Sequence, residues 1–179
     1  MSGNCPRRIG LFERNEYDTD MKLDLTKEQH RDLGIDLNNL TWKLLEHDGR
    51  TESENERMVN AAHASAYHWS VGGTAVNAAR ADWLVSHVYA VLGRAISALH
   101  YAELCYEVRT EPELRDFDLA YAEEAMARAH ACSGNLTAAR EYYIKAKEAG
   151  DAIVDPEDRR IFQSDFRTGP WFGLLESET

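Results

Sequence analysis

The stretch from Ala79 to Val108 constrains the fold more than any other part of this chain. Small residues recur in it among large apolar ones, a mixture that suits two helices packed antiparallel at close range. These small residues are Ser86, Ala90, Gly93, Ala98 and Ala102. Gly93 falls between the two halves, where a turn is needed. The stretch therefore predicts a helical hairpin, and a related pattern after Asp116 predicts another.

Helical signals continue on both sides of this stretch. Thr26 is placed to cap a helix that ends before Gly49, and a second helix is expected over residues 52–70. Thr74 is placed to cap the third helix. After the second hairpin, Pro156 stands at the first turn of a further helix. The sequence predicts an all-α fold of about seven helices, arranged as antiparallel hairpins.

The chain divides into a short arm and one helical domain. Residues 1–24 lack helical periodicity, so we expect an irregular N-terminal arm whose Leu11, Phe12 and Tyr17 dock on the body. Residues 25–179 are expected to form the domain. Its C-terminal tail is rich in apolar residues, which predicts that the tail packs on the last hairpin.

Composition excludes several classes of function. The chain is 44% hydrophobic and 28% charged, as in a globular protein, and it has no apolar run long enough for a membrane span. It has no secretory signal, so we expect a cytoplasmic protein. A net charge of −11 argues against nucleic acid and anionic membranes as partners. Three cysteines without C-x-x-C spacing predict no disulfide framework or metal motif, and Cys105 and Cys132 are expected to be buried apolar residues.

The turn glycines recur at a regular distance along the chain. Gly49, Gly93 and Gly134 are separated by 44 and 41 residues, a spacing typical of helical repeats. On its two matched hairpins, about 79–108 and 117–150, the chain resembles the tetratricopeptide repeat (TPR) family. The first match comprises Val85, Ser86, Tyr89, Gly93, Ala98, Ala102 and Cys105. The second comprises Met126, Ala127, His130, Gly134, Ala139, Tyr143 and Ala146. The resemblance implies a right-handed TPR-like array.

The chain also departs from the family pattern. Asp82 and Glu123 stand where the motif has its leading Trp, and the period exceeds the 34 residues of the family. The closing Pro is displaced to Pro112 and Pro156. The first hairpin matches only as helix–turn–helix, because Glu54 stands where a helix-packing Ala is expected.

In the TPR family, the first helix of each pair lines a concave groove that usually holds a peptide. Carried over to this chain, the resemblance assigns eight residues to that groove. They are Arg80, Trp83, His87, Val91, Tyr121, Glu124, Arg128 and Cys132. Spacings of three and four place Arg80, Trp83 and His87 on one helix face, and likewise Tyr121, Glu124 and Arg128. Such a set suits a carboxylate or phosphate and a flat or apolar group. The alternative is that Arg80 pairs with Asp82 or another local acid and that Trp83 fills the interface with the second helix.

The sequence thus favours a non-enzymatic protein-binding module that holds a peptide or protein segment and needs no cofactor or metal. No nucleophile motif or H-E-x-x-H pattern is present. One alternative is a small-ligand or metal-binding helical protein, an enzyme included, that uses His63, Tyr67 and His87; a metal would need His63, His87 and His130 to converge. A second alternative is a structural subunit that pairs with another copy of itself.

Overall fold

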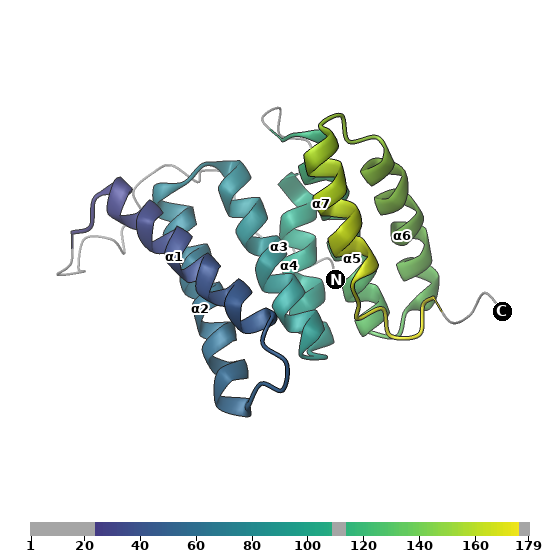
Figure 1. Ribbon diagram of the computed structural model, residues 1–179, viewed down its shortest axis with the longest axis horizontal. Helices are drawn as coiled ribbons and strands as arrows, with labels where there is room; N and C mark the ends of the chain where they lie inside the picture. Colours follow the sequence, from purple (N-terminus) through teal and green to yellow (C-terminus); the bar gives the residue numbers. More distant parts are fainter. Residues whose placement is uncertain (1–23, 109–113, 176–179) are drawn as a thin grey trace, which may run out of the picture.

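The computed structural model describes residues 24–108 and 114–175, and these form an all-helical fold (Figure 1). Within these ranges there are seven helices and no strand. The helices are α1 Lys27–Leu45, α2 Glu52–Gly72, α3 Ala75–Val91, α4 Ala95–Glu107, α5 Asp116–Cys132, α6 Leu136–Asp151 and α7 Pro156–Arg167. The prediction of an all-α fold is confirmed. The expected N-terminal arm, with Leu11, Phe12 and Tyr17, lies outside the described residues except for Asp24.

The first three helices each begin with a reciprocal capping box. Thr26 accepts a hydrogen bond from the backbone of Gln29, whose side chain accepts one from the backbone of Thr26. Thr51 and Thr74 make the same arrangement at the starts of α2 and α3. These caps satisfy backbone donors that a helix start otherwise leaves unpaired. The predicted caps Thr26 and Thr74 are confirmed.

Consecutive helices pack in pairs, and short turns join them. α1 packs on α2, α3 on α4, and α5 on α6, while α3 also contacts α5 (Figure 1). Gly93 and Gly134 lie in the turns of the second and third pairs with φ of 68° and 79°. This left-handed conformation suits glycine because other L residues meet a steric cost there. Both glycines therefore lie between helices, as the sequence predicts.

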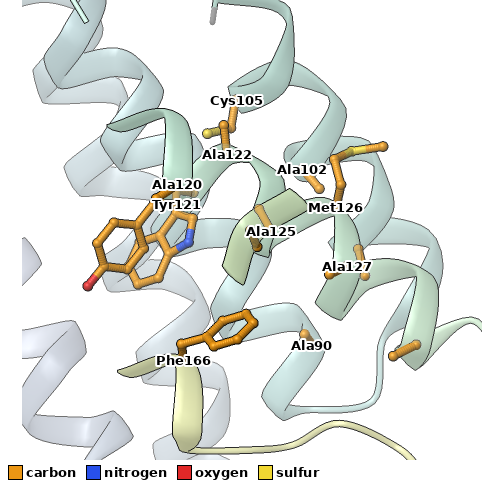
Figure 2. Packing of buried hydrophobic residues seen from close by; sticks show 14 of the residues in the cluster. Ala90, Ala102, Cys105, Ala120, Tyr121, Ala122, Ala125, Met126, Ala127 and Phe166 are labelled. Carbon is orange, nitrogen blue, oxygen red and sulfur yellow. The ribbon is translucent and has the colours of Figure 1, made fainter. Parts of the chain in front are cut away.

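The core is built largely from alanine. Ala98 and Ala102 of α4, Ala120 and Ala127 of α5 and Ala139 of α6 are completely buried. Figure 2 shows part of this alanine-rich seam together with larger residues at its edge. A separate cluster joins α1, α2 and α3; its members are Leu44, Met58, Val59, Ala62, Val85 and Val88. Small side chains let the α4, α5 and α6 backbones approach closely, and buried aromatic residues such as Phe162 and Phe166 complete the same cluster.

The last helix and the segment after it cover one end of the helical array. α7 packs on α5 and α6, and Phe162 and Phe166 are buried. Trp171 is buried against Tyr143 and Phe166, with ring centroids 5.0 and 5.3 Å away, and its indole N–H donates to the Phe166 carbonyl. Leu174 is buried as well. No helix in residues 24–108 and 114–175 combines the length and apolar character needed to cross a bilayer.

Candidate functional site

The two helix faces that the sequence assigns to a groove do meet. The indole N–H of Trp83 on α3 donates to Glu124 Oε2 on α5 at 2.8 Å. The rings of Trp83 and Tyr121 pack edge to face with centroids 4.9 Å apart. Trp83 and Tyr121 are 9% and 8% exposed. Trp83 of α3 therefore contacts both Tyr121 and Glu124 of α5.

Glu124 and Arg128 do not present a surface to a ligand. Both side chains are 2% exposed, and Arg128 Nε donates to Glu124 Oε1 in a buried ion pair. Arg128 Nη1 also donates to the Thr168 carbonyl at 3.0 Å, and its guanidinium lies 4.4 Å from the Trp171 ring centroid. This corrects the predicted groove: the segment after α7 lies over these residues, so they hold the C-terminal end to α5.

His87 is also held within the protein. Its ring stacks on Trp83 with centroids 5.2 Å apart and lies near Trp42, and the buried Nδ1 has no hydrogen-bond partner among the described residues. Burial, helped by the positive charge of Arg128, lowers the pKa of His87 to about 3. The ring is therefore neutral at physiological pH and acts as a flat packing element rather than a general acid.

Arg80 occupies a different environment from Arg128. Its Nε and Nη2 donate to the two carboxylate oxygens of Asp118 at 2.6 and 3.1 Å. The Arg80 side chain is 47% exposed, whereas that of Asp118 is 4% exposed. The acid that Arg80 bonds is Asp118, 38 residues away along the chain. Arg80 instead joins α3 to the first turn of α5, and its other face remains in contact with solvent.

A pocket of about 240 Å³ opens beside Arg80, between α1, α3, α5 and α7. Aromatic rings supply much of its wall. Its lining consists of Asn38, Trp42, Ala79, Arg80, Trp83, Leu84, Cys105, Leu114, Phe117, Asp118, Tyr121, Ala122, Ile161 and Asp165. Three of the six predicted site residues, Arg80, Trp83 and Tyr121, belong to this lining. The pocket therefore keeps two of the three predicted α3 residues and one of the three predicted α5 residues.

Asp165 of α7 is a pocket residue that the sequence did not indicate. The hydroxyl of Tyr121 donates to its Oδ2 at 2.6 Å. Burial, together with this carboxylate, raises the pKa of Tyr121 above its usual range, so the phenol keeps its proton. Trp42 of α1 was not predicted as a site residue either. Its ring stacks on that of Trp83 of α3, with centroids 5.9 Å apart. Trp83 thus packs on α1 and α5 rather than filling an interface with α2.

The histidines predicted as an alternative metal site lie in separate contacts. His63 Nε2 hydrogen-bonds the Tyr89 hydroxyl at 2.7 Å, whereas His87 stacks on Trp83 and His130 stacks on Tyr142. Over the part of the chain that the structure describes, no three His, Cys, Asp or Glu side chains form a group that could hold a metal ion. Convergence of His63, His87 and His130 is therefore not observed.

Tyr67, the third residue of the small-ligand alternative, is also engaged elsewhere. Its ring contacts those of His30 and His68, whose Nδ1 atoms lie 2.9 Å apart. His63, Tyr67 and His87 thus make three separate sets of contacts and share no site in this structure.

The two described cysteines have no features of a reactive thiol. Cys105 is buried at the base of the pocket, and burial raises the pKa of its thiol well above the usual range. Burial also raises the pKa of the half-buried Cys132, whose sulfur lies 4.0 Å from the Ala90 carbonyl. A nucleophilic cysteine needs a lowered pKa, so both act as small apolar residues. Cys5 lies outside the described residues.

Comparison of the chain with models of known protein families finds no match, and comparison with curated proteins and with solved structures finds none either.

Proposed function

We propose that this chain is a TPR-like interaction module, without catalytic activity, that binds a segment of another protein. The observation that carries the proposal is the pocket between the first helices of successive pairs, α1, α3 and α5, together with α7. In the TPR family these helices line the ligand groove. The pocket would accept one side chain of the bound segment, and the exposed edges of α1 and α7 would contact its neighbours.

The packing of the helices supports the TPR-like part of the proposal. Ala98, Ala102, Ala139 and Ala146, which hold small-residue places of the motif, are all completely buried. Each lies in the second helix of a pair, where the family brings neighbouring helices into close contact.

The size of the pocket favours a single side chain over a larger ligand. Sites for drug-sized molecules usually measure about 300–1,000 Å³. A volume of about 240 Å³ falls below that range. Ile161, 39% exposed, and Arg80 stand at the rim, where a bound chain would enter. A protein segment can add contacts outside the pocket, whereas a small molecule must obtain its whole affinity inside it.

A peptide library displayed on phage and selected against the full chain would test this function. Dissociation constants of the selected peptides would then be measured by titration calorimetry against three variants. Ala79→Met extends a pocket-lining side chain into the cavity and should weaken binding at least ten-fold. Ile161→Ser removes an apolar rim residue and should weaken it less.

Ile96→Ser is the matched control, because Ile96 is 91% exposed on α4 and is not among the pocket residues. It should leave binding unchanged. Circular dichroism would verify that each variant is folded. If folded Ala79→Met and Ile161→Ser proteins kept the affinity of the unmodified chain, or if no peptide were selected, the pocket would not be a peptide site.

A further inference from the structure

The four rings of the pocket are set in several planes. Trp42 and Trp83 are inclined by 29°, Trp83 and Tyr121 by 77°, and Phe117 and Tyr121 by 62°. Rings at such angles enclose a guest from more than one side. The face of an aromatic ring is electrically negative, so a group of rings attracts an organic cation more than a neutral group of the same size.

The pocket already contains one cation on an aromatic ring. The guanidinium of Arg80 lies 5.6 Å from the Phe117 ring centroid. Its charge is balanced locally, because both of its bonded nitrogens face the carboxylate of Asp118. A guest would therefore meet this pair as a nearly neutral unit at the rim.

The remaining charge of the lining is negative. Among the described residues of the lining, Arg80, Asp118 and Asp165 are charged, one cation against two anions. Once Arg80 and Asp118 are paired, the carboxylate of Asp165 is left over, with one oxygen accepting the Tyr121 hydroxyl. Arg128 approaches the backbone carbonyl of Asp165, but its own charge is paired with Glu124. An apolar guest would desolvate the Asp165 carboxylate without compensation, whereas a cation would compensate it.

We propose that the pocket is selective for an alkylammonium group, the side chain of lysine or of a methylated lysine in the partner segment. The inference rests on the proposed function in one respect, that the side chain comes from a bound protein segment. The preference of the pocket for a cation does not depend on that function. The aliphatic stem lies among the rings of Trp42, Trp83 and Tyr121, and the charged head approaches Asp165. The net charge of −11 assists by attracting basic segments toward the surface.

The test uses a pair of small probes with the same shape and different charge. Choline carries a trimethylammonium group, and 3,3-dimethylbutan-1-ol has a neutral tert-butyl group in its place. Binding to the full chain is followed by indole N–H signals in NMR, because Trp42 and Trp83 line the pocket. We expect choline to bind roughly five-fold more tightly or better, the scale of a cation–π preference. Equal or tighter binding of the alcohol, or no binding of either probe, would overturn the proposal.

Asp165→Asn tests the proposed role of the carboxylate. The amide oxygen can still accept the Tyr121 hydroxyl, so the variant removes charge while it keeps that contact. Choline should bind several-fold more weakly to it, and the alcohol should bind as before. Equal losses for both probes would indicate a change of pocket shape and would contradict selectivity by charge.

The selected peptides separate this inference from the function itself. Replacement of their anchoring lysine by norleucine, which keeps most of the stem and removes the ammonium, should weaken binding about five-fold or more. Peptides that bind the pocket through an apolar residue would leave the function intact and refute the cation preference. Binding of choline without any peptide ligand would refute the function and support the chemistry of the pocket.

Discussion

Arg80 and Arg128 were predicted to line the same groove, but the structure places them in opposite environments, one open to solvent and one buried. Each pairs with a nearly buried carboxylate, Asp118 or Glu124. The Arg80 side chain is 47% exposed, and that of Arg128 is 2% exposed. The difference arises from what lies over them: Arg128 is covered by the segment after α7, whereas Arg80 borders a pocket. Of the two predicted helix faces, the part at Arg80 on α3 therefore borders an open pocket, and the part at Arg128 on α5 holds the C-terminal segment.

The comparison matters for energetics as well as for exposure. An ion pair removed from water becomes very costly to break, because the partner left behind is a buried charge without compensation. A pair whose cation is 47% exposed should cost less to break, since solvent already screens the arginine and the carboxylate lines an open pocket that water can enter. The same change at the two arginines should therefore have effects of very different size.

The largest effect is expected for Arg128→Met. Glu124 would be left charged and buried, so we expect a loss of about 3–5 kcal/mol in the free energy of unfolding, measured by urea denaturation. Adding Glu124→Gln should recover part of this loss, because an amide still accepts the Trp83 N–H and carries no charge. A loss no greater than that from Arg80→Met would show that the covered and open ends do not differ.

Gly150→Ala should have the next largest effect. A Cβ added at Gly150 on α6 would overlap the ring of Phe162 on α7. Overpacking of this kind typically costs about 1–3 kcal/mol, and here it should loosen α7 and the segment that covers Arg128. Hydrogen exchange should then accelerate in residues 156–175 more than in α1–α3. Ser164→Ala is the control, because Ser164 is exposed on α7. It should leave the exchange pattern unchanged.

His87→Phe should change how stability depends on pH. The folded pKa of His87 is lowered to about 3, while the unfolded value is near 6.5. Below pH 6.5 the unfolded chain takes up a proton that the folded chain does not, so this histidine's stabilisation is complete above 6.5 and declines from there toward pH 3. The slope is at most about 1.4 kcal/mol per pH unit. The Phe variant should retain the ring packing and lose the part of the slope that comes from the proton of His87. The free energy of unfolding, measured at pH 5 and pH 7, checks this.

Other histidines leave part of that slope in place. Burial also lowers the pKa values of His63, His68 and His130. The variant should therefore flatten the pH dependence without abolishing it. An unchanged slope would mean that His87 can take up a proton in the folded protein.

Arg80→Met should have the smallest effect, about 1 kcal/mol or less in the free energy of unfolding. Half of the Arg80 side chain is already in water, and Asp118 keeps the hydrogen bond from the backbone N–H of Arg115 at 3.1 Å. A loss of the size predicted for Arg128→Met would show that the open end depends on its ion pair as strongly as the covered end does.

The sequence predicted the parts of this molecule that depend on local spacing. Caps such as Thr26 and Thr74 and turns such as Gly93 are properties of a few neighbouring residues, and the structure confirms them. The face shared by Arg80 and Trp83 was also predictable, because a helix places residues three and four apart together.

The rest of the site depends on contacts that no local pattern records. Asp118 lies 38 residues from Arg80, and Asp165 lies 44 residues from Tyr121. Neither spacing has a meaning until the helices are packed. The apolar tail predicted a contact with the last hairpin, but nothing in its composition indicated that Trp171 would lie on Arg128. A buried arginine and an exposed one look alike in sequence because their environments are built by distant residues.

The glycine turns between helices have a consequence for how this chain could be altered. An atom added at Gly93 or Gly134 in the place of Cβ would meet nothing within 4 Å, so neither turn is crowded. What each turn requires is a backbone of the opposite hand to that of ordinary residues. A D-alanine installed there by chemical synthesis would suit the native conformation and restrict the unfolded chain. The turns at Gly93 and Gly134 therefore restrict the chirality of the residue that can replace glycine and not its size.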